Sequence, residues 1–433
     1  MEKICILGLG YVGLTLAVHA AGAGFEVYGV EISDETRDII SEGRAPFHEP
    51  GIDNLIQQFL DERLFISERV PENIEFSVII VSVGTPLMRG SIPAPNLDIL
   101  AQCIEDIATV VNENALVVLR STVPVGTTRQ VEKEILEKTA LESINIAFCP
   151  ERTAEGNALY ELQHLPQVIS GNTPHAEEKS REFFLQLANE TILASSLEEA
   201  EITKLFNNVY RDSIFALANT FSHIAQEFGV DGRCAIENAN YNYSRSNIPI
   251  PGFVAGPCLE KDAYILTSNM SDDVLKNNIL SSREMNQKIE VDLGEWLNKC
   301  LCSSEYQGLI LITGLAFKGR PATNDLRGSS SIRILDRLKK FNSRIHCHDH
   351  ENTKEQLSKH LNFNCLPNDF YRGKHKCKYD LIIILNNHAS YTSEPFHDFV
   401  NEQTLAGAKI FDAWGVLEND HNLTLTNYRI DKI

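Results

Sequence analysis

A glycine-rich turn between two short apolar strands is the feature that most restricts how this chain can fold. Residues 4–7 have the pattern of a buried strand, and Gly8, Gly10 and Gly13 follow with GxGxxG spacing at the start of a helix pattern that reaches about Ala23. Such glycines permit a tight turn and let the backbone approach a pyrophosphate at the positive end of the helix. The sequence therefore predicts a βαβ dinucleotide-binding unit. The alternative is a tight strand-to-helix turn in an unrelated α/β protein.

An acidic residue ends the second strand of this unit. Residues 27–30 form the expected strand, and Glu31 follows it directly. A carboxylate in this place accepts hydrogen bonds from both ribose hydroxyls and repels a 2′-phosphate, so we expect NAD rather than NADP. The expected cofactor contacts in this unit are Gly8, Gly10, Tyr11, Val12, Gly13 and Glu31.

Strand and helix patterns alternate over the remainder of the chain, except in its middle. Further buried strands are expected at 77–83, 115–120, 144–148, 309–313, 344–347, 380–385 and 408–411. Residues 188–229 have a long helical periodicity, and the helical region reaches residue 301 with one Pro/Gly-rich interruption at 248–257. The expected fold class is α/β, with two Rossmann-like doubly wound parallel sheets joined by a central helical domain. The expected segments are 1–195, 196–304 and 305–433.

Composition excludes several classes of partner. The chain has 433 residues, 39 basic against 59 acidic side chains, and a formal net charge of −20, which argues against nucleic acid as a partner. No apolar run approaches the ~18 residues of a membrane span. We expect no signal peptide, and the ten cysteines have no CxxC spacing, so we expect reduced thiols in a cytoplasmic protein.

One cysteine lies where a thiol could act chemically. Cys258 follows the Pro/Gly-rich stretch 248–257 and precedes Asp262 by four residues. A thiol in a rigid loop of a protein that binds NAD suits aldehyde oxidation: it adds to the aldehyde, hydride leaves the adduct, and the thioester is hydrolysed. The alternative for Cys258 is a small packing residue.

With these motifs, the chain resembles the UDP-glucose/GDP-mannose dehydrogenase family of nucleotide-sugar dehydrogenases. The motifs that carry the resemblance are, in chain order, Gly8 to Gly13; Val81-Ser82-Val83-Gly84-Thr85-Pro86; Ser121-Thr122-Val123-Pro124-Val125-Gly126-Thr127-Thr128; Cys149-Pro150-Glu151-Arg152 with Glu155-Gly156; Lys204 with Asn208; Cys258 to Asp262; and Gly314-Leu315-Ala316-Phe317-Lys318 with Asp325, Arg327 and Ser329. They span all three expected segments in the order of the family.

The resemblance implies a four-electron oxidation of a sugar C6 alcohol to the carboxylate with two NAD⁺. It assigns Cys258 as nucleophile, Lys204 and Asn208 as stabilisers of oxyanion charge, and Asp262 as an acid that works with the lysine and a water. The remaining catalytic assignments are Thr122, which holds a water, Glu155, the general base for thioester hydrolysis, and Glu151 in a supporting role. Each residue also has a non-catalytic interpretation. Lys204 and Asn208 could lie on a solvated helix face, the two glutamates could favour a helix N-terminus, and Thr122 could be a turn residue.

The resemblance also assigns binding residues. Thr85, Pro86, Thr122 and Arg327 join the cofactor contacts, and Arg245 reaches the substrate of a neighbouring subunit across a homodimer formed by the central helix. The alternative for that helix is burial within one chain. The expected substrate contacts are Glu151, Arg152, Lys204, Asn208, Arg245, Phe253, Gly256, Phe317 and Lys318.

The substrate is expected to be a UDP-sugar. Cys-Pro-Glu-Arg resembles the branch that acts on UDP-N-acetylhexosamines, because the UDP-glucose branch tends to have Phe in place of Arg152. UDP-glucose and GDP-mannose remain alternatives, as do a one-step NAD oxidoreductase and a non-catalytic nucleotide-sugar sensor. Three departures are notable: Ala255 replaces a usual glycine and is strained if that position needs positive φ, Phe253 and Val254 are larger than usual, and no basic residue follows Asp412.

Three histidines alternate near the start of the last segment. His346, His348 and His350 occupy alternate positions, so their side chains could share one face of a strand and bind a metal. The strand also ends where polar residues of a Rossmann-like sheet meet a ligand crevice. We expect no metal.

Overall fold

The computed structural model describes residues 1–88, 90, 93–302, 307–373, 377–417 and 426–428. The chain divides into two compact units, each described here by itself. Unit 1 comprises Met1–Asn208 and Lys261–Asp273, and unit 2 comprises Val209–Glu260 and Val274–Ile433. The cysteine loop therefore ends in unit 2, whereas the acidic residue four positions after Cys258 belongs to unit 1.

Unit 1 is built on a six-stranded parallel sheet in the order β3-β2-β1-β4-β7-β8. Its strands are β1 (Lys3–Leu7), β2 (Glu26–Val30), β3 (Leu64–Ser67), β4 (Val78–Val81), β7 (Leu116–Leu119) and β8 (Asn145–Phe148). Its helices are α1 (Tyr11–Ala23), α2 (Asp34–Ser41), α3 (Ile52–Phe59), α4 (Asp98–Ala108), α5 (Thr127–Lys138), α6 (Ala158–His164) and α7 (Pro174–Leu185). Helix α1 covers the range that the periodicity predicts, and the strand order reverses beside β1, where doubly wound sheets bind ligands.

Alternate residues of these strands enter two separate cores. Ile4 and Ile6 of β1 belong to one apolar cluster, whereas Cys5 and Leu7 belong to the other. All four side chains are almost completely buried. This is the packing expected of a sheet with helices on both faces, because successive side chains of a strand point to opposite sides.

Unit 2 contains a second six-stranded parallel sheet, in the order β13-β12-β11-β14-β15-β16. Its strands are β11 (Leu309–Thr313), β12 (Ile345–His348), β13 (Asn364–Cys365), β14 (Tyr379–Ile384), β15 (Thr404–Asp412) and β16 (Thr426–Tyr428). The helices that flank it are α12 (Ser330–Arg337), α13 (Lys354–His360) and α14 (Glu394–Gln403), with 3-10 turns η1 (Lys339–Arg344), η2 (Phe370–Arg372) and η3 (Ala389–Thr392). The expected fold class, two Rossmann-like sheets and a helical middle, is confirmed.

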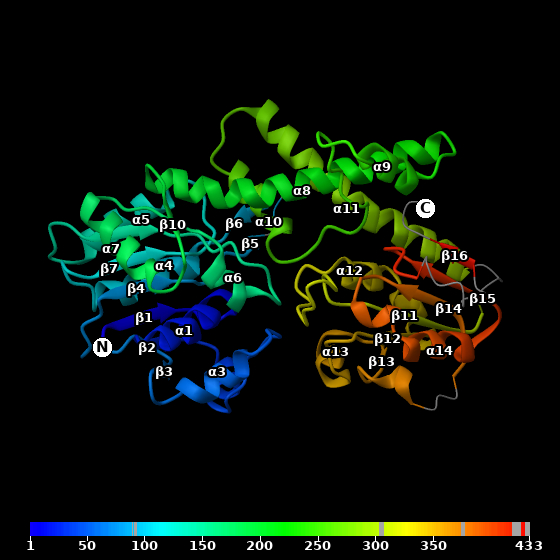
Figure 1. Ribbon diagram of the computed structural model, residues 1–433, viewed down its shortest axis with the longest axis horizontal. Coiled ribbons are helices and arrows are strands. Elements are labelled where there is room, and N and C mark those ends of the chain that lie inside the picture. Colours follow the sequence, from blue (N-terminus) through cyan, green and yellow to red (C-terminus); the bar gives the residue numbers. More distant parts are fainter. Residues whose placement is uncertain (89, 91–92, 303–306, 374–376, 418–425, 429–433) are drawn as a thin grey trace. The chain divides into compact units, whose positions relative to one another are not determined.

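Two long helices form the middle of the chain (Figure 1). Helix α8 (Leu197–Glu227) begins in unit 1 and ends in unit 2, and α11 (Asp273–Cys302) lies almost entirely in unit 2. Between them come α9 (Gly232–Asn240), the cysteine loop and α10 (Leu259–Thr267). The Pro/Gly-rich interruption at 248–257 is confirmed as a loop.

Some expected element limits are wrong. The helical pattern was expected from residue 188, but β10 (Thr191–Leu193) forms there and pairs in parallel with β9 (Gln167–Ile169), so the helix begins only at Leu197. The two-stranded antiparallel pair β5 (Leu87–Met88) and β6 (Ala94–Pro95) was not expected either. These strands are too short to show a period in the sequence. Among the described residues, no helix is long and apolar enough to cross a membrane.

Candidate active site

The glycine turn after β1 has the geometry of a dinucleotide site. Gly8 has φ +88°, and a Cβ on Gly13 would lie 1.8 Å from the Gly8 carbonyl oxygen, so both positions need glycine. A Cβ on Gly10, by contrast, would meet nothing within 4 Å. The turn is therefore open on the side of Gly10, at the N-terminus of α1, where amide N–H groups and the helix dipole favour a phosphate. Tyr11 and Val12 begin this helix.

The carboxylate of Glu31 is held in place at the end of β2. Its Oε2 accepts a hydrogen bond of 3.0 Å from the Leu9 amide, and its Oε1 accepts one of 2.9 Å from the Ser33 amide. Each oxygen keeps a further lone pair. The residues of this turn and strand end thus fit NAD, and the role of Glu31 toward the ribose stays a prediction.

Side chains at the ends of β4 and β7 connect the loops that follow them. Thr85 is 2% exposed and donates a hydrogen bond of 2.6 Å to the Thr122 carbonyl. Lys261, which the sequence analysis did not single out, donates to Thr85 Oγ1 at 3.2 Å. Pro86 and Thr122 therefore lie in loops that one short network holds together.

Lys204, Asn208 and Asp262 form a buried polar cluster. They are 8%, 9% and 1% exposed, so a solvated helix face is excluded for the pair on α8. Asn208 Nδ2 donates to Asp262 Oδ2 at 2.6 Å, and Lys261 Nζ lies 3.5 Å from Asp262 Oδ1. The structure thus brings Asn208 and Asp262, which are 54 positions apart in the sequence, into direct contact, and Lys204 lies one helical turn before Asn208 on α8.

Glu151 forms a buried ion pair with Arg120. One of its oxygens pairs with Arg120, whose side chain is 0% exposed, and the other accepts 2.7 Å hydrogen bonds from the Arg152 and Thr153 amides. Burial acts to raise the pKa of the Glu151 carboxyl, but the charge of Arg120 and the hydrogen bonds outweigh it, so the pKa lies below the ordinary value. A carboxylate so engaged is a poor proton acceptor, which supports the minor role expected for Glu151. Nothing in the sequence analysis pointed to Arg120.

Glu155 lies in a loop that a second buried carboxylate fixes. Glu49 is 5% exposed and accepts hydrogen bonds from the Tyr11 hydroxyl, the Gly156 amide at 2.8 Å and the Leu159 amide at 3.2 Å. The loop of Glu155 is thereby attached to the first residue of α1. Glu49 was also missed, because a glutamate before a Pro-Gly pair is an ordinary loop residue in sequence.

Unit 2 holds the thiol. Cys258 is exposed at the end of its loop, directly before α10. Gly256 has φ +102°, and a Cβ there would lie 2.6 Å from the Phe317 ring, so this ring packs on the loop where only glycine fits. Positive φ among the described non-glycine residues occurs at Asp61 and Asn242, so Ala255 is not strained and the expected cost of replacing a glycine there does not arise.

The cysteine loop also lines a cavity of about 620 Å³. Four of the lining side chains are cationic: Arg211, Arg233, Lys318 and Arg320. The others are Phe215, Ile250, Phe253, Val254, Ala255, Leu259, Phe317, Asn387, Thr392, Trp414, Gly415 and Val416. Arg233 also pairs with Glu237 at 3.1 Å, and in a strongly acidic chain such a group of cations suits an anionic ligand such as a diphosphate.

Within this cavity, Arg233 contacts the segment that follows Asp412, which itself contains no basic residue at 413–415. Its Nη1 donates to the Trp414 carbonyl at 3.2 Å. A Cβ on Gly252 would lie 2.7 Å from the Trp414 ring, so the indole packs directly on the cysteine loop. Arg211, Arg233 and Arg320 were not predicted, because they come from separate elements.

Two expected binding residues have local partners. Arg327 forms hydrogen bonds of 2.6–3.0 Å with the Asp325 carboxylate and is 68% exposed, and Arg152 donates to the Pro166 carbonyl. Arg245 is exposed, with its guanidinium 4.9 Å from the Tyr243 ring centroid. The roles of all three toward ligands stay predictions.

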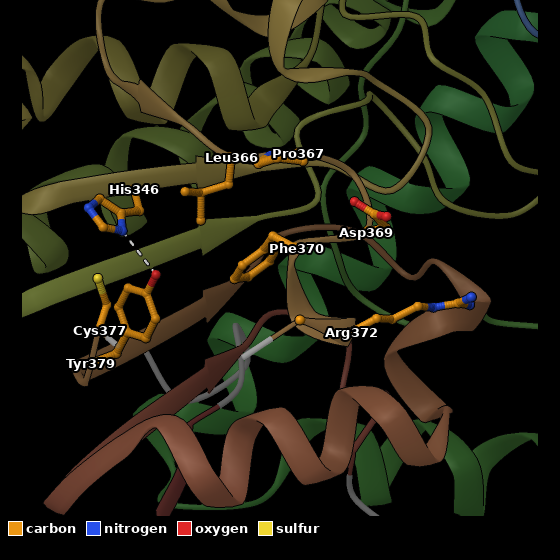
Figure 2. Close-up of a pocket in the computed structure, with 9 residues that line it drawn as sticks. His346, Leu366, Pro367, Asp369, Phe370, Arg372, Cys377 and Tyr379 are labelled. Carbon is orange, nitrogen blue, oxygen red and sulfur yellow. Dashed lines mark hydrogen bonds between the residues drawn. The ribbon is translucent and has the colours of Figure 1, made fainter. Parts of the chain in front are cut away.

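A second hollow, of about 360 Å³, lies in unit 2 beside β12 and β14 (Figure 2). His346 and Tyr379 face each other in it, with a 2.9 Å hydrogen bond between ring nitrogen and hydroxyl. None of the expected catalytic or binding residues lines it.

The alternating histidines do not all share one site: the His348 and His350 ring centroids lie 4.7 Å apart, whereas His346 bonds to Tyr379. His346 points into the hollow of Figure 2, whereas His348 bonds to Thr313 and the Asn368 carbonyl, and His350 stacks on His388 at 4.7 Å. Burial lowers the pKa of His348 to about 4 and of His350 to about 2. In the described part of the chain, no group of three or more His, Cys, Asp or Glu side chains is arranged to hold a metal ion.

Comparison with known proteins identifies the family. Three models of the UDP-glucose/GDP-mannose dehydrogenase family match in order: the NAD-binding domain at residues 2–188, the central domain at 198–288 and the UDP-binding domain at 311–419. The chain is 32% identical to a UDP-N-acetyl-D-mannosamine dehydrogenase of Pyrococcus horikoshii, over 80% of this chain and 83% of that one. It is 31% identical to a protein of the same name from Campylobacter jejuni, over 79% and 84% of the two chains.

A solved structure agrees with the relatives. The UDP-D-ManNAc dehydrogenase of Pyrococcus horikoshii superposes with a TM-score of 0.83 at 27% identity, covering 100% of this chain and 99% of that one. Together with the dinucleotide turn and the cationic cavity, these matches show that the chain belongs to the UDP-glucose/GDP-mannose dehydrogenase family and is an NAD-dependent nucleotide-sugar dehydrogenase.

Proposed function

We propose that this enzyme oxidises the C6 alcohol of a UDP-N-acetylhexosamine, with UDP-N-acetylmannosamine as the first candidate, to the uronic acid. The observation that carries the proposal is the cavity of unit 2, where residues on both sides of Cys258 line the same space as four cationic side chains. A nucleoside diphosphate held by those cations would place its sugar beside the thiol. The names of the relatives supply the sugar, since both act on UDP-N-acetylmannosamine by name.

In the proposed reaction the first oxidation removes a proton from the C6 hydroxyl and a hydride from C6 itself, which gives the aldehyde. NAD⁺, held at the glycine turn and Glu31, supplies a hydride acceptor for each of the two oxidations. The proton leaves through the polar cluster of Lys204, Asn208 and Asp262, whose donors also stabilise negative charge on the C6 oxygen.

Cys258 acts on the resulting aldehyde. Its thiolate forms a C–S bond to C6 as the C=O π bond breaks, and the oxygen takes up a proton to become the hydroxyl of a thiohemiacetal; Lys204 and Asn208 are the proposed stabilisers of charge on this oxygen. Loss of a hydride and a proton from this adduct gives the thioester. Water, activated by Glu155 and held by Thr122, then attacks C6; the C–S bond breaks, the thiolate is restored and the carboxylate is released.

We further propose a homodimer formed through α8. Large apolar side chains recur along this helix and directly after its end, with spacings of three, four and seven residues: Phe206, Tyr210, Leu217, Phe221, Ile224 and, just after the helix, Phe228, which are 37–78% exposed. Such a stripe favours burial against a partner helix. The proposal places Arg245 at the substrate of the neighbouring subunit, and sedimentation of a Leu217→Glu/Phe221→Glu variant tests it: a monomer supports the dimer interface, and an unchanged mass contradicts it.

The division into segments 1–195, 196–304 and 305–433 also stays a proposal, supported by the three family models. So does a cytoplasmic location, which is favoured by ten cysteines that form no disulfide.

A panel of nucleotide sugars tests the substrate. Wild type and Cys258→Ser are incubated with NAD⁺ and UDP-N-acetylmannosamine, UDP-N-acetylglucosamine, UDP-N-acetylgalactosamine, UDP-glucose or GDP-mannose, and NADH absorbance and uronate are recorded. We expect the highest kcat/KM with an N-acetylhexosamine and no uronate from Cys258→Ser, which still binds UDP. Preference for UDP-glucose or GDP-mannose would correct the substrate. Binding of UDP-sugars without any turnover would instead indicate a sensor.

A further inference from the structure

Four buried polar side chains form a hydrogen-bond network with the backbone of the cysteine loop. Asp212 and Asn219 lie on α8, and Arg283 and Asn286 lie on α11. They are 2%, 1%, 0% and 0% exposed, respectively. We refer to these four residues as the loop clamp, and all of them, like the loop, belong to unit 2.

Arg283 connects the two sides of the thiol. Its Nη2 donates to the Val254 carbonyl at 3.0 Å and its Nη1 to the Leu259 carbonyl at 3.2 Å, so one guanidinium bonds to the backbone four residues before and one residue after Cys258. The same Nη1 donates to Asp212 Oδ1 at 2.8 Å. A planar guanidinium has donors in the fixed directions that such bridging requires, whereas an ammonium group does not.

The other members fix the start of the loop. Asn219 bonds to both polar groups of one residue: its Nδ2 donates to the Gly252 carbonyl at 3.0 Å, and its Oδ1 accepts from the Gly252 amide at 2.9 Å. Asn286 accepts from Asn219 at 3.0 Å and donates to Asp212 Oδ1 at 2.8 Å. The clamp is therefore one continuous network from Gly252 to Leu259.

The loop clamp buries a charged arginine side chain completely. A fully buried arginine is strongly unfavourable unless it is paired. The pairing here is incomplete: Arg283 Nε lacks a hydrogen-bond partner among the described atoms, and burial raises the pKa of Asp212 despite the nearby arginine. A network of this kind is not needed to join two helices, which apolar residues do at least as well.

We propose that Arg283 is a positioning residue for catalysis, which fixes Cys258 and the Phe253–Ala255 wall of the cavity relative to each other. The proposal rests on the proposed role of Cys258. Its physical basis is that thiol attack requires the reacting atoms at about 3–3.5 Å, and a displacement of about 1 Å can lower a rate by about 10²-fold.

The test compares Arg283→Ala and Arg283→Lys with Lys288→Ala. Lys288 lies on the same helix, is 56% exposed and pairs with Asp292, so it is a matched control without loop contacts. For Arg283→Ala we expect kcat for NADH formation to fall about 100-fold, with the Kd of UDP changed less than about threefold, because the cavity cations remain. Arg283→Lys should recover little of the lost kcat, because a lysine cannot bond to the Val254 and Leu259 carbonyls at the same time. Addition of 20–50 mM guanidinium, but not of NaCl or urea, should restore much of the kcat of Arg283→Ala.

A second measurement does not depend on activity. Hydrogen exchange of the loop amides, followed by mass spectrometry of peptides that cover 249–259, should be at least about tenfold faster in Arg283→Ala than in wild type or Lys288→Ala. If Arg283→Ala does not fold, Asn219→Ala replaces it, because this variant removes no charge. It should also lower kcat and speed hydrogen exchange of the loop, but by less than Arg283→Ala.

The outcomes separate the two proposals. Unchanged loop exchange, or a kcat within threefold of wild type, would overturn the role of Arg283. A kcat that falls only in proportion to the folded fraction, without guanidinium rescue, would overturn it as well. If instead Cys258→Ser makes uronate normally, the proposed function fails, while loop exchange still decides whether the clamp exists.

Discussion

The buried pair of Arg120 and Glu151 gives the sharpest prediction about stability. Arg120→Met keeps much of the side-chain volume but leaves the Glu151 carboxylate, 8% exposed, without its cation. It also removes the donors to the Cys149 carbonyl at 3.1 Å and to Gln167 Oε1 at 3.2 Å. Removal of one partner of a buried ion pair costs about 3–5 kcal/mol, because the other charge remains buried.

The loss should appear in unit 1. We expect its free energy of unfolding at pH 7 to fall by about 3–5 kcal/mol, and its Tm by about 6–20 °C at about 2–4 °C per kcal/mol for a unit of this size. The denaturant dependence of hydrogen exchange in β7 and β8 measures the free energy locally, which suits a chain with more than one unit. Lys133→Met, which breaks the exposed pair with Glu137, is the control and should change stability by less than about 0.5 kcal/mol.

The pH dependence provides an independent check. The pKa of Glu151 is lowered in the folded protein, so its stabilisation is present above the unfolded value near 4.5 and is lost as pH falls through the folded pKa. In Arg120→Met the burial remains without the cation, so the folded pKa should rise above the unfolded one. Protonation of Glu151 then removes the buried charge in the variant. The difference in free energy of unfolding between wild type and Arg120→Met should therefore become smaller from pH 7 to pH 5.

Two results would refute this reasoning. One is a loss below about 1 kcal/mol for Arg120→Met, and the other is a deficit that does not change with pH. Arg120→Met/Glu151→Gln should be more stable than Arg120→Met, because the buried charge is absent.

Three further predictions concern the site. Glu31→Ala should raise KM for NAD⁺ about 10- to 100-fold by removing charge-assisted hydrogen bonds to ribose, while the KM of the UDP-sugar stays within threefold in steady-state kinetics; equal changes in both would contradict cofactor binding by Glu31. Asn208→Ala should lower kcat about 10²- to 10³-fold with UDP affinity unchanged by calorimetry, since it removes a donor beside Asp262; a normal kcat would exclude it from the site. Glu49→Gln places an amide against three donors, so unit 1 should lose about 1–3 kcal/mol in denaturant-dependent hydrogen exchange and thioester hydrolysis should slow in a single-turnover assay; wild-type values of both would refute the link to Glu155.

Regular elements were predictable where a period extends over several residues. The apolar runs of most central strands and the helix after the glycine turn were located to within about two residues, because their burial on a fixed face imposes the pattern. An exception is β15, which begins at Thr404, four residues before its expected start. β9, β10, β5 and β6 are two or three residues long and were missed. In β10, moreover, Ile192 and Leu193 are 47% and 41% exposed, so no core imposes a pattern on it.

The site was predictable only where chemistry is local in sequence. The glycine turn, Glu31 and the cysteine loop are local, and the structure gives each the expected surroundings. Arg120, Glu49 and Arg283 act on groups 31, 107 and 29 positions away, and no pattern in a single sequence indicates such partners. What identifies these residues is that each is a buried charged side chain, and burial is known only from the folded structure.

The central claim is that one thiol carries an alcohol through to an acid. The most direct measurement is the ratio of NADH formed to UDP-sugar consumed, taken to completion with limiting UDP-N-acetylmannosamine and excess NAD⁺. The account predicts two NADH and one uronate for each sugar. One NADH for each sugar, with the aldehyde as the product, would contradict it.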